Sequence, residues 1–228
     1  MKRRNKAIEF NIKDGEGRRK FKQFFENFVD EFVNKNKNYF AETNDVVYRY
    51  RELQLNTVIA PILEKISNAF LCEHPTTRGL RISEKEDSFG RIDFWVKDGS
   101  AIYLIELKHG FNGLGSGILR DATKSKWKKA KEQLSIIKED PEVFRIGKND
   151  NILKVALMVI TTYTSKLNNE ANNNDCSQIS QLIKNELVLK HDYAIAELVA
   201  FDDMQCIFDY TNGSESYPYL HIVAQIIS

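Results

Sequence analysis

Two carboxylates and a lysine stand close together in one short stretch of the chain. Asp93 is followed by Glu106 and Lys108, and a single residue separates the last two. Carboxylate oxygens are the ligands that Mg²⁺ and Mn²⁺ prefer in proteins. An ammonium beside such a cation can orient the attacking water, help to deprotonate it, or neutralise charge in the transition state. These residue types therefore point to metal-assisted hydrolysis.

The sequence RIDFWVKDGSAIYLIELKHG, residues 91–110, predicts a β-hairpin around these residues. Asp98 and Gly99 suit the two central positions of a type I′ turn, because both positions need a positive φ. Strong β-formers flank the pair on both sides. With this turn, the cross-strand pairs are Lys97 with Ser100, Trp95 with Ile102, Asp93 with Leu104, and Arg91 with Glu106.

Side chains alternate between the two faces of a strand, so one face of this hairpin is apolar and the other is charged. The apolar face has Ile92, Phe94, Val96, Tyr103, Ile105 and Leu107, and the other has Asp93, Trp95, Leu104, Glu106 and Lys108. Asp93 and Glu106 become diagonal neighbours with α-carbons roughly 7–8 Å apart. Two carboxylates at that separation can bind one cation.

Asp93 and the Glu106-Leu107-Lys108 triplet on a hydrophobic strand resemble the motif of the PD-(D/E)xK nuclease superfamily, which has the restriction-endonuclease-like fold. Ile92 stands where the motif has its proline. The resemblance implies a nuclease that depends on Mg²⁺ or Mn²⁺. In it, Asp93, Glu106 and the backbone carbonyl of Leu107 would bind the metal, and Lys108 would position or activate water.

The resemblance also implies supporting residues on two helices. Many nucleases of this superfamily have an acidic residue on a helix ahead of the hairpin, and Glu52 is the best match. Gln133, in A-x-x-Q-L on the helix after the catalytic strand, resembles a glutamine near the active site of RecB-like and related branches. Ile137 replaces the tyrosine that often follows it there. The alternative for Glu52 is a surface carboxylate paired with Arg49, Arg51 or Lys65.

A cross-strand ion pair on a solvated sheet face is the alternative explanation of Asp93, Glu106 and Lys108. An E-x-K triplet is expected by chance about once in a chain of this length. However, this E-x-K is the only one in the chain, and it interrupts the apolar run AIYLIEL. Burying unpaired charges in such a run would be costly, which favours a functional site.

Apolar periodicity predicts the elements that position these residues. Phenylalanines at 21, 24, 25, 28 and 32 predict a helix over residues 18–39. This stripe packs in the core or, alternatively, forms a homodimer interface. Further helices are predicted over 45–70, 121–138 and, from Ser177, to 190. Strands are predicted over 80–83, 152–163, 193–201, 204–210 and 219–227, with a polar connection at 73–78.

Two basic segments could contact phosphates. One is the N-terminal stretch 1–20, and the other is the helix over 121–138, where Lys124, Lys128 and Lys131 line one side. A frayed terminus and a solvated helix face are the respective alternatives. The formal net charge of +1 indicates no indiscriminate binding to polyanions.

Composition is that of an ordinary globular protein, with 42% hydrophobic and 29% charged residues. No run approaches a membrane span and no secretory signal is present, so we expect a cytoplasmic location and no membrane partner. Three scattered cysteines argue against a disulfide framework or zinc site.

The order of elements predicts one α/β domain with a mixed sheet flanked by helices. The resemblance implies the same arrangement, the restriction-endonuclease-like fold. Residues 1–44 are expected to form a basic and aromatic N-terminal helical extension, residues 45–165 the core with the motif, and residues 166–228 a C-terminal helix and strands. The expected function is a metal-dependent nuclease, with DNA as substrate and endonucleolytic action. A non-catalytic module on the same fold, binding nucleic acid or a protein, is the alternative.

Overall fold

The computed structural model describes residues 6–78, 88–165, 173–200, 207–211 and 213–227. The helices are α1 (Arg18–Thr43), α2 (Glu52–Ile66), α3 (Asp121–Ser135) and α4 (Asn173–Glu186), with a 3-10 turn η1 (Val47–Arg49). The strands are β1 (Lys6–Asn11), β2 (Ala69–Arg78), β3 (Ser88–Asp98), β4 (Ala101–Gly113), β5 (Asn151–Thr164), β6 (Tyr193–Val199), β7 (Ile207–Tyr210) and β8 (Gly213–Ile227).

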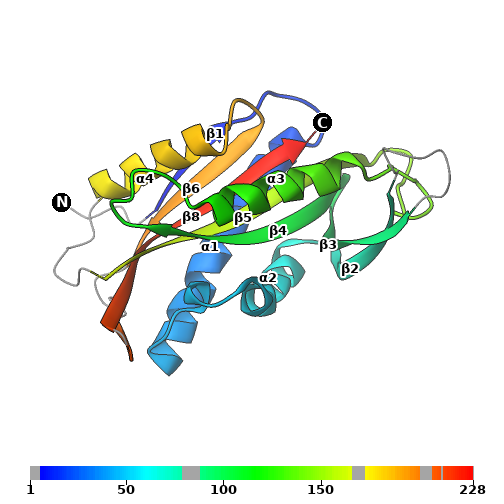
Figure 1. The fold of residues 1–228 in the computed structure, drawn as a ribbon. Helices are drawn as coiled ribbons and strands as arrows, with labels where there is room; N and C mark the ends of the chain where they lie inside the picture. The colour runs from blue at the N-terminus through cyan, green and yellow to red at the C-terminus, as the bar shows by residue number, and fades with distance from the viewer. Residues whose placement is uncertain (1–5, 79–87, 166–172, 201–206, 212, 228) are drawn as a thin grey trace.

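One mixed sheet of eight strands forms the centre of the fold, in the order β1-β6-β8-β5-β4-β3-β2, with β7 paired to β8. Only β4 and β5 pair in parallel among these strands; the other pairs are antiparallel. Helices α1 and α2 cover one face and α3 and α4 the other (Figure 1). The prediction of a mixed sheet flanked by helices is therefore confirmed.

The N-terminal segment is part of the core, which corrects its description as an extension. Strand β1, which the sequence reading missed, pairs with β6 at one edge of the sheet. Phe21, Phe24, Phe25, Phe28 and Phe32 of α1 are at most 4% exposed, and the ring of Phe24 contacts that of Tyr103 of β4 with ring centroids 4.5 Å apart. The aromatic stripe is therefore core packing, as predicted, and is not available as a dimer interface.

Several predicted boundaries were wrong. The expected helix over 45–70 is divided into η1 and α2, and Pro61 lies inside α2 without ending it. Residues 73–78, read as a polar connection, belong to strand β2. Helix α4 begins at Asn173 rather than at a Ser177 cap, and β8 begins at Gly213. The strand predicted over 80–83 lies outside the described residues.

The hairpin between β3 and β4 exists, but its register differs from the prediction. Asp98 pairs with Ala101 and Trp95 with Leu104, so Gly99 and Ser100 form the turn. Only Gly99 of these two has a positive φ, as in a type II′ turn, and its N–H donates to the side chain of Asn68. The register is thus shifted by two residues from the prediction, and Leu104 pairs with Trp95 instead of Asp93.

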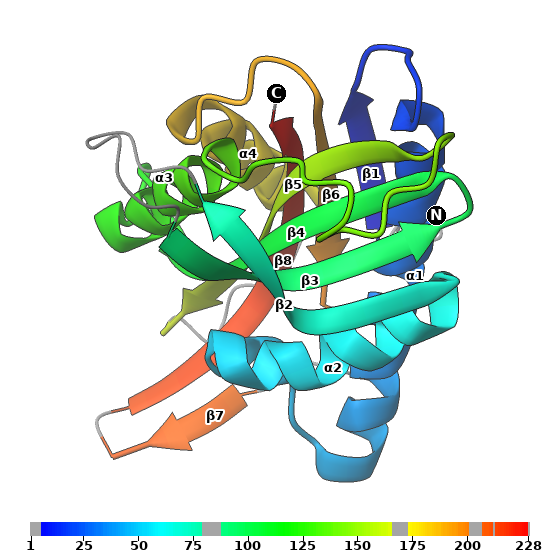
Figure 2. The ribbon, with the colours of Figure 1, turned by 90° about the vertical axis from the view of Figure 1, so that its right-hand side faces the viewer.

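The pairing between β3 and β4 ends at Phe94 and Ile105, although β4 continues to Gly113. On its other side β4 stays paired with β5 over its full length. Beyond Ile105, β4 thus has one edge without a neighbouring strand. Figure 2 shows this region, with β2 and β3 crossing in front of β4 and α2 beside them.

Gly110 allows α3 to lie close against this part of β4. A Cβ at Gly110 would meet Thr123 Cγ2 at 2.5 Å and Met158 Cε at 2.8 Å. No larger residue fits without moving the helix, so this glycine sets the height of α3 above the strand. No helix within the described ranges is long and apolar enough to cross a membrane.

We predict that Phe25→Ala lowers the free energy of unfolding by about 3–5 kcal/mol, because it leaves a cavity in the core beneath α1. Urea unfolding followed by circular dichroism measures this change. Leu53→Ala is the control: Leu53 is 71% exposed, and its loss should change stability by less than about 0.5 kcal/mol. Equal effects of the two substitutions would contradict the placement of α1 in the core.

Candidate active site

Side chains complete the hydrogen bonding of the β4 edge that β3 leaves open. The N–H of Leu107 donates to Asp93 Oδ2 (2.7 Å), and the N–H of His109 donates to Glu52 Oε2 (3.0 Å). The N–H of Phe111 donates to Thr123 Oγ1 (3.2 Å). Buried backbone donors need partners, so three side chains from β3, α2 and α3 replace the missing strand.

The carbonyl groups of the same edge are also bound by side chains. Lys108 Nζ donates to the carbonyl of Leu107 (2.7 Å) and Lys126 Nζ to that of His109 (2.8 Å). The hydroxyl of Thr123 donates to the carbonyl of Phe111 (2.9 Å). Elements from both layers of helices therefore meet at one edge of the sheet.

The predicted site residues of the hairpin converge at this edge, around the ammonium of Lys108. Its Nζ lies 2.9 Å from Glu106 Oε1, 3.7 Å from Asp93 Oδ2 and 3.9 Å from Glu52 Oε1. Glu106 is almost fully buried, at 2% exposed. The structure thus brings together Asp93, Glu106 and Lys108, and it adds Glu52 from α2.

Glu52 is held in place as the first residue of α2. Two of the alternative partners that the sequence offered are engaged elsewhere: Arg49 pairs with Asp45, and Lys65 with Glu31. Glu52 instead contacts the β4 backbone and approaches Lys108. It therefore lies at the Lys108 cluster and not in an ion pair with Arg49 or Lys65.

The electrostatic setting keeps Lys108 protonated. Burial by itself lowers the pKa of this amine, but the charge and hydrogen bond of Glu106 and the charges of Asp93 and Glu52 outweigh burial and raise the pKa above its ordinary value. A protonated amine cannot accept a proton. In this state Lys108 supplies positive charge and hydrogen bonds.

The donor set fits a small divalent cation. Two carboxylates, Asp93 and Glu106, and the carbonyl of Leu107 already surround one cation, the Lys108 ammonium. Mg²⁺ commonly takes one or two carboxylates and completes its shell with water or phosphate oxygens. Within the described ranges no group of three or more His, Cys, Asp or Glu side chains is arranged to hold a metal ion.

The other predicted residues lie on α3, and the structure does not place them at the cluster. Gln133 is half-buried, and its Oε1 has no hydrogen-bond partner among the described residues. Lys124 pairs with Asp121 and Glu186, and Lys128 approaches Glu132. Lys131 lies over the ring of Trp127.

Lys126 is the lysine of α3 that reaches the edge of β4, and the sequence reading missed it. The signal was present: Lys126 precedes Ala130 and Gln133 at helical spacing, on the stripe expected to face the sheet. His109 points away from Lys108, as expected, and its ring contacts Thr161 Oγ1.

Among the residues that the structure describes, one cysteine lies beside a histidine, a pair that the sequence did not predict. Cys176 Sγ lies 3.7 Å from His221 Nε2, and both residues are buried. Burial raises the pKa of the Cys176 thiol to about 12 and lowers the pKa of His221 to about 4. A nucleophilic cysteine needs a thiolate, so this pair is structural.

His74 is also structural, stacked against Trp95 and Phe144.

Comparisons of the chain with protein-family models, with characterised proteins and with solved structures find no match. The chemistry of the cluster must therefore be judged from its geometry.

We predict that Lys108→Met lowers the free energy of unfolding by about 3–5 kcal/mol, because it removes the ammonium that contacts buried Glu106. The double variant Glu106→Gln/Lys108→Met should recover most of this loss. Urea unfolding of the two single variants and the double variant gives the coupling energy. Additive effects would show that the two side chains do not depend on each other.

The neutral, buried His221 predicts a dependence of stability on pH. Its pKa is lowered to about 4 in the folded state, whereas the unfolded chain takes up the proton near pH 6.5. The contribution of neutral His221 to the free energy of unfolding is therefore complete above about pH 6.5. It is lost as the pH falls toward 4, at up to about 1.4 kcal/mol per pH unit.

His221→Gln should flatten this slope when unfolding is measured between pH 7 and 4.5. The control is His191→Gln, whose histidine side chain is 66% exposed and should leave the slope unchanged. A slope in His221→Gln equal to that of the wild type would disprove the assignment.

Proposed function

We propose that this protein is a Mg²⁺-dependent nuclease of the restriction-endonuclease-like type, which hydrolyses phosphodiester bonds, with DNA as the first substrate to test. The observation that supports it best is the convergence of Glu52, Asp93 and Glu106 on the Lys108 ammonium at the open edge of β4. Asp93, Glu106 and Lys108 of this group form the D…ExK motif in the sequence.

The carboxylates of the cluster support the binding of a second cation. In the part of the chain that the structure describes, three carboxylates lie within 4 Å of the Lys108 ammonium. Carboxylates gathered at a partly buried site attract a divalent ion. Asp93, Glu106 and the Leu107 carbonyl are the oxygens that would hold it. When bound there, the ion would polarise a phosphate oxygen and lower the pKa of a bound water.

The backbone contacts give the cluster a fixed geometry. Asp93 accepts from the N–H of Leu107, and Glu52 accepts from the N–H of His109, so both carboxylates are oriented before a ligand arrives. Such preorganisation is a major source of rate enhancement, because no reorientation is needed during the reaction. Lys108 would place its positive charge against the phosphate in the transition state.

A non-catalytic binding module is the second candidate function. It is favoured by the contacts of Lys108, which donates to Glu106 and to the Leu107 carbonyl without any ligand. A cluster of this kind can serve as a buried ion pair that fixes the end of β3 against β4. The two candidates differ in metal binding and in cleavage.

We expect cleavage of supercoiled plasmid in Mg²⁺ or Mn²⁺ and none in EDTA. Glu106→Gln, which removes one charge at nearly constant volume, should lower the rate at least about 100-fold. Mn²⁺ binding followed by electron paramagnetic resonance should weaken in the same variant. The control is Glu64→Gln, an exposed carboxylate of α2, which should keep full activity.

The two readouts separate the candidate functions. Metal binding that depends on Glu106, together with metal-dependent cleavage, supports the nuclease. If the wild-type protein does not bind Mn²⁺ and does not cleave plasmid, single-stranded DNA or RNA, the nuclease proposal fails. The non-catalytic binding module is then the better explanation of the cluster.

A further inference from the structure

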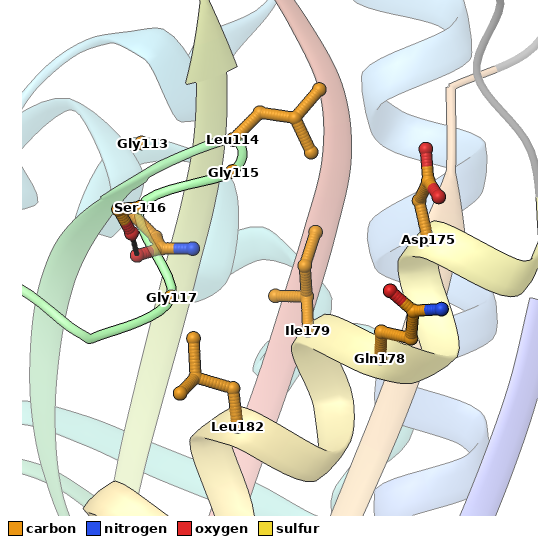
Figure 3. Close-up of a pocket in the computed structure, with 10 residues that line it drawn as sticks. Gly113, Leu114, Gly115, Ser116, Gly117, Asp175, Gln178, Ile179 and Leu182 are labelled. Carbon is orange, nitrogen blue, oxygen red and sulfur yellow. Dashed lines mark hydrogen bonds between the residues drawn. The ribbon is translucent and has the colours of Figure 1, made fainter.

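A cavity of about 490 Å³ lies between the loop that follows β4 and helix α4 (Figure 3). This volume is in the range of about 300–1,000 Å³ that small-molecule sites have. The end of β4 and the loop after it contribute residues 112–117, and α4 contributes Asp175, Gln178, Ile179 and Leu182. Ile179 and Leu182 point from α4 toward the loop that bears Leu114 and Ser116.

Asn112 supplies a polar group to this cavity that its own chain does not satisfy. The residue is 1% exposed, and its Oδ1 lies 3.3 Å from Ser116 Oγ, whose single proton is donated to the carbonyl of Ile118 (2.7 Å). Its Nδ2 has no hydrogen-bond partner among the described residues. A buried amide donor without an acceptor is unfavourable, so this position points to an acceptor that comes from a ligand.

The lining of the cavity suits a neutral, planar ring better than a phosphate. Leu114, Ile179 and Leu182 give it aliphatic walls, and Gln178 and Asp175 add polar groups at one side. No lysine or arginine is among the described residues that line it, and the carboxylate of Asp175 would repel an anion. Rings extruded from a nucleic-acid strand bind between apolar side chains and hydrogen-bond at their edges.

The glycines of the loop leave its peptide groups accessible to a ligand in the cavity. Gly115 and Gly117 have φ values of 78° and 69°, and a Cβ on either would meet nothing within 4 Å. The loop is nevertheless anchored, because the N–H of Leu114 donates to the carbonyl of Tyr163 and Ser116 Oγ donates to that of Ile118. A flat ligand can therefore approach the peptide groups of a loop that keeps its shape.

The cavity lies along the same strand as the candidate active site. Asn112 follows Lys108 by four residues of β4, which corresponds to about 13 Å at the rise of a β-strand. At about 3.4 Å per nucleotide along a strand of B-form DNA, this distance is a few nucleotides. A strand with its scissile phosphate at Lys108 could place a nearby base at Asn112.

We propose that this cavity binds one unpaired nucleobase of the substrate strand, a few nucleotides from the scissile phosphate. The inference rests on the proposed nuclease function and adds that the substrate is single-stranded or locally unpaired. Cytosine and adenine fit best, because each has an amino group next to a ring-nitrogen acceptor on its Watson–Crick edge: the Asp175 carboxylate can accept from the amino group and the Asn112 amide can donate to the ring nitrogen. Thymine offers only acceptors and a ring N–H at the corresponding edge.

Equilibrium binding of fluorescent oligonucleotides in EDTA tests this proposal without cleavage. The probes are single-stranded dC, dA and dT homopolymers of equal length and one mixed-sequence duplex. Leu182→Trp fills the cavity and should weaken binding of the dC and dA strands about tenfold, the size expected for loss of one bound base. It should leave duplex binding unchanged. Asn112→Leu should reduce the preference for dC and dA over dT.

The matched control is Gln181→Trp, which puts the same bulky side chain on the exposed side of α4 and should bind as the wild type does. Circular dichroism verifies that each variant folds. A folded Leu182→Trp variant with wild-type affinity overturns the cavity assignment, as does a wild type without single-strand binding. If either of these results is found together with metal-dependent cleavage, only the nucleobase site is refuted, and the nuclease proposal still holds. Cavity-dependent binding without cleavage would instead refute the nuclease and retain a nucleobase site.

Discussion

The structure depends on how the open edge of β4 is satisfied. Strand β3 stops pairing at Ile105, and the backbone groups of the next residues on that edge cannot remain unbonded in the interior. Asp93, Glu52, Thr123 and Lys126 provide the missing partners. Because these side chains come from a strand and from helices on both faces of the sheet, the edge fixes the relative positions of all three layers.

This arrangement links stability to chemistry. Asp93 and Glu52 each accept a hydrogen bond from a backbone N–H of β4 through one carboxylate oxygen. Both carboxylates also lie within 4 Å of the Lys108 ammonium. A substitution at either residue therefore disturbs the fold and the cluster together. By contrast, the side chain of Glu106 enters the cluster from β4 itself, so Glu106→Gln is the cleaner probe of charge.

The sequence was sufficient for the fold class, the buried strand β5 and the main members of the cluster. Alternation along β3 and β4 fixed which side chains share a face, and a register error of this kind preserves that alternation, so Asp93, Glu106 and Lys108 still met. The turn itself was misplaced, because Asp98-Gly99 and Gly99-Ser100 are both acceptable turn pairs. Strand β1 was missed because its partner, β6, is remote in the chain. Lys126 was missed because the lysines of this helix were judged by charge, although its spacing to Ala130 and Gln133 indicates the side that faces the sheet.

The pairing of the first strand with the sixth has a consequence for how the chain folds. The side chain of Asn11 bonds to a carbonyl 179 residues later, so the β1 edge of the sheet cannot form until most of the polypeptide has left the ribosome. Contacts this distant in sequence form slowly, because a long loop must close first. Until then, the phenylalanine stripe of α1 lacks part of the strand surface against which it packs. The nascent chain therefore exposes an apolar helix face, which a chaperone would recognise.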